Sequence, residues 1–127
     1  MDRTRILIID NEADFGGLLK KNLELSCGFA VDVAVNGREG IQKAKRRPHL
    51  ILLDIQMPGM DGFEVLEALK KDPDTREIPV VLLTAREDEE SKIKAMQLFD
   101  EGYLTKPVEL AVLKSKIEEV LKRRRPA

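Results

Sequence analysis

Short apolar runs alternate along the chain with longer segments whose apolar residues recur at helical spacing. The apolar runs predict strands at 5–9, 29–34, 50–53 and 80–83, with a weaker strand at 102–105. The runs LILL and VVLL are apolar throughout, which is typical of strands covered on both faces. FAVDVA, at 29–34, alternates instead and predicts an edge strand.

The segments between these strands predict helices at 12–25, 37–46, 63–71, 88–98 and 109–122. Cys27-Gly28 is a typical end for the first helix, and Asn36-Gly37 is a typical start for the second. Strand and helix thus alternate five times, which predicts an α/β fold. We expect a five-stranded parallel sheet with right-handed crossovers and a total of five helices distributed over its two faces.

Length, charge and cysteine content narrow the class of protein. The 127 residues suit one domain, expected at 1–122, with 123–127 as a basic tail or the start of a linker. Lys plus Arg is 22 and Asp plus Glu is 23, a balance that argues against direct binding of nucleic acid or a membrane surface. No apolar run approaches the roughly 18 residues of a membrane span. Cys27 is the only cysteine, so a cytoplasmic, reducing location is expected.

Polar groups stand at the ends of four predicted strands. Asp10-Asn11-Glu12 follows the first strand, Asp54 the third, Thr84 the fourth and Lys106 the fifth. Taken singly, each fits a helix cap or a solvated surface residue. Parallel strands, however, bring their carboxyl ends to one edge of the sheet, where ligands bind in folds of this kind. Two or three carboxylates, a hydroxyl and an ammonium at that edge form a set suited to phosphoryl transfer.

The chemistry of these groups favours a magnesium-dependent reaction. Clustered carboxylates repel one another, and a divalent cation relieves that repulsion. Asp10, Asp54 and a carbonyl from the following loop are hard oxygen ligands of the kind that Mg²⁺ prefers. A carboxylate can also act as the nucleophile and form an acyl phosphate. Lys106 and Thr84 would then neutralise the oxygens of the transferring group.

Four segments, IIDNE, LLDIQMPGMDG, PVVLLTA and YLTKP, occur in this order between residues 8 and 107, so the resemblance that they carry extends over essentially the whole chain. Together they resemble the receiver domain of bacterial two-component response regulators, and LLDIQMPGMDG is the most specific of them. The resemblance implies a flavodoxin-like, doubly wound sheet of strand order 2-1-3-4-5. It also implies a cis peptide between Lys106 and Pro107.

The resemblance also implies the roles of single residues. Asp54 would be the phosphoacceptor, receiving its phosphoryl group from a histidine kinase or a histidine phosphotransfer protein. Asp10, Asn11 and the main-chain carbonyl of Gln56 would hold Mg²⁺ together with Asp54. Such a domain is no enzyme beyond catalysing its own phosphorylation and dephosphorylation.

A switch is implied as well. Thr84 would turn toward the phosphoryl group, Lys106 would pair with it, and Tyr103 would turn inward behind Thr84. This would change the surface formed by the helix at 88–98, the strand at 102–105 and the helix at 109–122. A downstream protein, an output domain or a second copy in a homodimer would read that surface.

Two departures from the family pattern leave an alternative open. Asn11 stands where the family usually has a second acid, which predicts weaker Mg²⁺ binding, and Phe99-Asp100 replaces a typical Gly-Ala pair. Asn11 slightly favours a pseudo-receiver, a protein-interaction scaffold that needs no phosphate. An aspartyl-nucleophile phosphatase would need an acid at Gln56, and a flavodoxin-like cofactor binder would need a phosphate loop in place of DNEAD.

Overall fold

The computed structural model describes residues 3–85 and 101–124. Its strands are β1 (Arg5–Ile9), β2 (Ala30–Ala34), β3 (Leu50–Asp54), β4 (Val80–Ala85) and β5 (Tyr103–Lys106). Its helices are α1 (Ala13–Cys27), α2 (Gly37–Ala44), α3 (Gly62–Lys71) and α5 (Leu110–Arg124). The helix expected at 88–98 and the Phe99-Asp100 pair lie outside the described residues.

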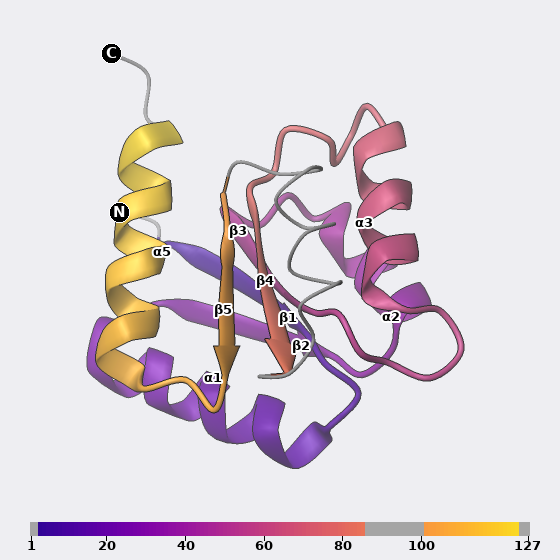
Figure 1. Ribbon diagram of the computed structural model, residues 1–127. Coiled ribbons are helices and arrows are strands. Elements are labelled where there is room, and N and C mark those ends of the chain that lie inside the picture. Colours follow the sequence, from indigo (N-terminus) through magenta and orange to yellow (C-terminus); the bar gives the residue numbers. More distant parts are fainter. Residues whose placement is uncertain (1–2, 86–100, 125–127) are drawn as a thin grey trace.

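The strands form one parallel sheet in the order β2-β1-β3-β4-β5, which confirms the predicted topology and the edge position of β2. Helices α1 and α5 cover one face, and α2 and α3 cover the other (Figure 1). Every strand points its carboxyl end toward the same edge, because all the pairings are parallel. That edge therefore collects the residues that follow the strands.

Side chains alternate between two cores, one on each face of the sheet. The face under α2 and α3 is built from Leu7, Ile9, Ile51, Leu53, Val80 and Leu82. The face under α1 and α5 is built from Ile6, Ile8, Leu50, Leu52, Val81 and Leu83. All twelve side chains are at most 2% exposed, so the uninterrupted apolar runs of the sequence are explained by burial on both faces.

The helix ends follow the local chemistry of the chain. Gly28 ends α1 in the left-handed conformation (φ 71°), and the Asn36 side chain accepts the Glu39 N–H at the start of α2, as the sequence predicts. At α3, Asp61 and Glu64 form a reciprocal capping box that the sequence reading missed. Most predicted bounds are off by one or two residues, because the terminal turns depend on such caps.

The outer edge of the sheet, on β2, is closed by side chains. Lys20 Nζ donates to the Val31 carbonyl at 2.9 Å, and Lys43 Nζ donates to the Val33 carbonyl at 2.8 Å. The Glu24 carboxylate accepts the Val31 N–H at 3.3 Å. These side chains occupy backbone groups to which an added strand would otherwise pair.

The loop after Asp54 packs closely against the end of β3. The Gly62 N–H donates to the Ile55 carbonyl at 2.8 Å, and Gly59 takes a positive φ of 79° in the turn between them. A methyl group at Gly62 would lie 2.5 Å from the Asp54 carbonyl oxygen and closer still to Ile55 Cα. Only glycine therefore lets α3 begin this close to Asp54.

We expect Gly62→Ala to lower the free energy of unfolding by about 1–3 kcal/mol, because the backbone must shift to admit the methyl group. Gly17→Ala is the matched control, since Gly17 lies in the interior of α1 with open space around it. That change should raise stability by about 0.5–1 kcal/mol. Urea denaturation measures the free energy of unfolding of both variants. If the two substitutions change it equally, the close approach of the backbone at Gly62 is contradicted.

Candidate functional site

Charged groups from three strands meet at the carboxyl edge of the sheet. Asp10 follows β1 directly and is fully buried, Asp54 ends β3 and is 3% exposed, and Lys106 ends β5. Lys106 Nζ lies 2.9 Å from Asp10 Oδ2 and 3.4 Å from Asp54 Oδ2. One ammonium thus bridges two buried carboxylates that come from neighbouring central strands.

These three side chains leave the sheet on the same face. Asp54 follows Leu52 by two residues, and Lys106 follows Leu104 by two, and both leucines pack under α1 and α5. Asp10 follows Ile8 in the same way. Because side chains alternate along a strand, the period of two residues carries all three groups to the face beneath the start of α1.

Backbone hydrogen bonds orient the two carboxylates. Asp10 Oδ1 accepts the Glu12 N–H at 2.9 Å, and Asp54 Oδ1 accepts the Gln56 N–H at 3.1 Å. In each case the second residue along the chain donates to the first carboxylate oxygen, which leaves Oδ2 facing Lys106. The break after each strand therefore fixes the rotamer of the acid that ends it.

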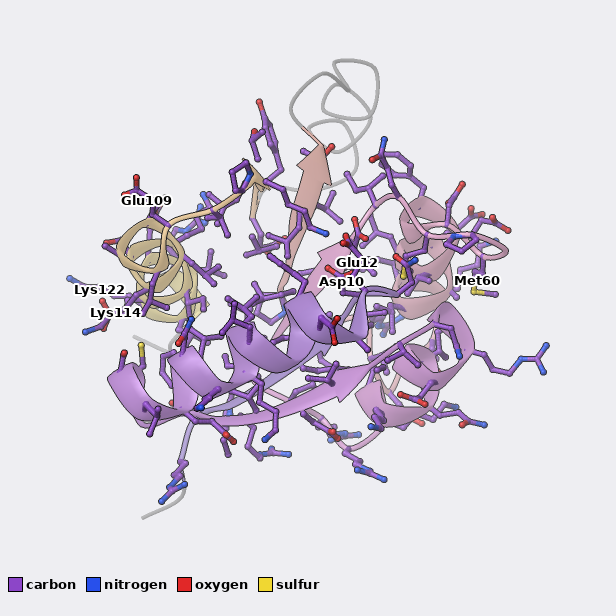
Figure 2. The ribbon with its side chains drawn as sticks, turned by 90° about the horizontal axis from the view of Figure 1, so that it is seen from below. Asp10, Glu12, Met60, Glu109, Lys114 and Lys122 are labelled. Carbon is purple, nitrogen blue, oxygen red and sulfur yellow. The ribbon has the colours of Figure 1, made fainter. Side chains whose placement is uncertain are left out.

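A third carboxylate, that of Glu12, joins the cluster. One oxygen each from Asp10, Glu12 and Asp54 lie within 4.8 Å of one another, and Glu12 Oε1 is 3.4 Å from Lys106 Nζ. Figure 2 shows Asp10 and Glu12 side by side where β1 leads into α1. Glu12 is the N-cap residue of α1, with extended backbone, and its place two residues after Asp10 was the available sequence signal. The family resemblance implies Asn11 as a metal ligand together with Asp10, Asp54 and the Gln56 carbonyl, and both Asn11 and Glu12 are exposed.

Thr84 and Tyr103 lie on the other face of the sheet. Thr84 is fully buried in β4 and follows Leu82, which packs under α2 and α3. Tyr103 is half-buried and packs against the same cluster. The two residues thus share a face, while Gln56 follows β3 with an exposed side chain. The peptide between Lys106 and Pro107 is cis, as predicted.

The charges of the cluster perturb one another. Burial, followed by the charge of Asp10, raises the pKa of Asp54 to about 6, although Lys106 acts in the opposite direction. Burial alone would lower the pKa of Lys106, but its hydrogen bond to Asp10 and the charges of Asp54, Asp10 and Glu12 raise that pKa overall. The ammonium therefore stays charged, and at neutral pH three carboxylates face one cation.

Residues 6–118 match the family model described as the response regulator receiver domain. The chain belongs to the response regulator receiver family. It is 32% identical over 123 residues to the phosphate regulon transcriptional regulatory protein PhoB of Rhizobium meliloti, covering 96% of this chain and 54% of that protein. It is 38% identical over 120 residues to the DNA-binding regulator RpaA of Synechocystis, covering 94% and 49%. This receiver chain thus spans about half the length of the curated relatives it matches.

Solved receiver structures share its fold. The receiver domain of a histidine kinase from Syntrophus aciditrophicus superposes with a TM-score of 0.86 at 33% identity, covering 98% of this chain and 94% of that one. A CheY-like receiver protein from Methanospirillum hungatei gives 0.87 at 29% identity, covering 97% of both chains. None of the receiver helices described in the structure is long and apolar enough to cross a membrane.

The raised pKa of Asp54 predicts how stability depends on pH. Its pKa rises on folding from 3.8 to about 6, so protonation of this carboxyl favours the folded state. That contribution is fully present below about pH 4 and is lost as the pH rises through about 6. Without divalent cations, we expect Asp54→Asn to be more stable than wild type at neutral pH by roughly 1–3 kcal/mol, and nearly equal to it near pH 4.

Urea denaturation at both pH values tests this expectation. Glu77→Gln is the control, because Glu77 is an exposed acid that precedes β4 at the opposite edge of the sheet. If Asp54→Asn raises the free energy of unfolding equally at both pH values, or lowers it at neutral pH, the pKa of Asp54 is not raised in the folded state.

Proposed function

We propose that this receiver accepts a phosphoryl group on Asp54, in a Mg²⁺-dependent reaction with a phosphohistidine donor. The observation that carries the proposal is the Lys106 ammonium, 3.4 Å from Asp54 Oδ2 and anchored on Asp10 at 2.9 Å. A surface carboxylate needs no such partner. A nucleophile that must meet a dianionic phosphoryl group needs a fixed cation beside it.

The chain's own groups account for the transfer step. An oxygen of Asp54 attacks the phosphorus atom, the new P–O bond forms as the P–N bond to the donor imidazole breaks, and the imidazole leaves. The Gln56 N–H holds the other Asp54 oxygen in place during the attack. Lys106 neutralises charge on the equatorial oxygens of the transferring group. The tight loop between Asp54 and Gly62 keeps the nucleophile in position.

The residues present fit a magnesium ion. Three carboxylates within 4.8 Å and one ammonium leave two negative charges at the edge of the sheet, which one divalent cation would offset. Burial raises the pKa of Asp54 most, and the charge of Asp10 raises it further, as expected where charge is not fully offset. Asp10, Asp54, Glu12 and the Gln56 main-chain carbonyl would hold the ion, and Asn11 is the remaining oxygen donor of the loop. When bound, Mg²⁺ supplies positive charge to the phosphoryl oxygens.

The position of Thr84 and Tyr103 on one face supports a switch. A phosphoryl group adds roughly −1.5 to −2 charge and three acceptor oxygens at the edge of the sheet. Thr84 turns toward it as a hydroxyl donor, and Tyr103, which packs against the same core, fills the space that Thr84 leaves. The surface that changes is made by β5, α5 and the segment 88–98, which lies outside the described residues.

The partners follow from this role. A histidine kinase or a histidine phosphotransfer protein donates the phosphoryl group, and the proposed place of the reaction is the cytoplasm. The curated relatives are transcriptional regulators about twice the length of this chain, so a DNA-binding output domain is one reader of the switch. The other two partners that could recognise the switch surface are a separate downstream protein and a second copy of this chain in a homodimer.

Incubation with acetyl phosphate and Mg²⁺, followed by intact mass measurement, should show the gain of one phosphoryl group. Asp54→Asn and excess chelator should each abolish the gain, whereas Asp61→Asn should keep it, because Asp61 only caps α3. If wild type gains no mass with acetyl phosphate or with a phosphohistidine donor, the phosphate-independent scaffold becomes the better reading.

The metal ligands can be tested by calorimetric titration with Mg²⁺. Glu12→Gln should weaken binding about five-fold, since one partly exposed charge contributes roughly 1 kcal/mol. Asn11→Asp should tighten binding, because it adds a charge beside Asp10. Asp14→Asn is the matched control, an exposed acid in the first turn of α1 outside the cluster. If Glu12→Gln behaves like this control, Glu12 is not a ligand.

A further inference from the structure

The first turn of α1 places an aromatic ring against the site. The Phe15 ring centroid lies 4.5 Å from Lys106 Nζ, although the two residues are far apart in the sequence. Phe15 is half-buried and packs against the core beneath α1 and α5. Its ring is thus held by the body of the protein and presented to the ammonium.

The ring complements the contacts that the carboxylates make. Asp10, Glu12 and Asp54 all lie within 3.4 Å of Lys106 Nζ. The face of an aromatic ring carries partial negative charge and attracts a cation, most strongly where water is excluded. Lys106 has only 17% of its side chain exposed, so little water competes for this contact.

The ring is in a position to restrict where the ammonium can go. A lysine side chain is long and flexible, and its head group can follow whichever carboxylate is free. In this site Glu12 is the most exposed acid, with 63% of its side chain accessible, and it would draw Lys106 outward. The Phe15 ring offers Lys106 Nζ a fixed partner that neither ionises nor binds the metal.

We propose that Phe15 is a positioning residue, whose ring holds the Lys106 ammonium at Asp54 so that it meets the incoming phosphoryl group. The inference rests on the proposed function, because the reaction that Lys106 serves is phosphoryl transfer to Asp54. Phe15 acts through Lys106 and touches neither the donor nor the metal. A residue that only fills the core at this position would be replaced by leucine without loss of rate.

Substitutions that change the ring but keep the fold separate these two roles. In the full chain, Phe15→Leu should slow phosphorylation of Asp54 by acetyl phosphate about 2- to 30-fold at saturating Mg²⁺. Phe15→Tyr and Phe15→Trp should retain the rate, because their rings also attract cations. Phenylalanines carrying more fluorine atoms at position 15 keep the volume and weaken the charge on the ring face, so the rate should fall stepwise with the number of fluorines.

Two controls isolate the contact. Phe29→Leu removes a ring that packs on the same core from the residue just before β2, and it should lower stability while leaving the rate unchanged. In a Lys106→Ala background, the fluorine series should become flat, because the ring then has no cation to hold. A rate that is insensitive to fluorination in the wild-type background would overturn the proposal.

The position of Lys106 can also be followed without any reaction. Cross-peaks of the Lys106 ammonium in a nitrogen-15 NMR spectrum should shift progressively across the fluorinated series, because the ring lies 4.5 Å away. If no variant takes up phosphate but these peaks still shift, the proposed function fails while the ring contact stands. If phosphate transfer proceeds and the peaks and rates stay constant, the proposed function stands and Phe15 is only a core residue.

Discussion

The contact between Lys106 and Asp10 is the constraint on which the site depends. Asp10 is completely buried, and a buried carboxylate without a cationic partner would strongly destabilise the fold. Its partner comes from β5, at the opposite end of the chain, so the edge strand must be in register before the charge on β1 is compensated. The same ammonium reaches Asp54 on β3, one of the two strands that lie between β1 and β5. The fold and the candidate chemistry thus share one interaction.

The sheet separates the groups that react from the groups that would respond. Asp10, Asp54 and Lys106 leave it on the face beneath α1 and α5, whereas Thr84 and Tyr103 lie on the face beneath α2 and α3. The strands that carry both groups are apolar and close-packed on both faces, so the sheet forms a rigid frame. A phosphoryl group at the end of β3 would reach the second face through the end of β4. This arrangement gives the proposed switch a short and defined route.

Much of the fold could be predicted because its strongest signals are local. The runs at 50–53 and 80–83 are apolar throughout, and Gly28 and Asn36 end and begin their helices as their chemistry requires. The strand order and the cis peptide before Pro107 came from the family resemblance, and both are confirmed. The helix predicted at 88–98 stays a prediction, and so do the roles of all the site residues: Asp10, Asn11, Asp54, Gln56, Thr84, Tyr103 and Lys106.

The contacts of Glu12 and Phe15 with Lys106 could not be predicted, for a different reason. Each lies beside Lys106, a residue from the last strand, so the contact exists only once the sheet has formed. Nothing in the local pattern distinguishes Phe15 from the other apolar residues of its helix. For Glu12 the two-residue spacing from Asp10 was visible, but it has meaning only in extended backbone, and a helix was predicted to begin there.

Chemical trapping of the phosphorylated residue shows whether Asp54 is the acceptor and whether Lys106 and Mg²⁺ serve it. Borohydride reduces an acyl phosphate of aspartate to homoserine, which stays in the chain and can be located by peptide mass spectrometry. After treatment with a phosphohistidine donor and Mg²⁺, we predict homoserine at position 54, far less of it when Lys106 is replaced by alanine, and none when Mg²⁺ is removed. Homoserine at position 10, hydroxynorvaline at position 12, or trapping at 54 that does not depend on Lys106 and Mg²⁺ would contradict this role of Asp54.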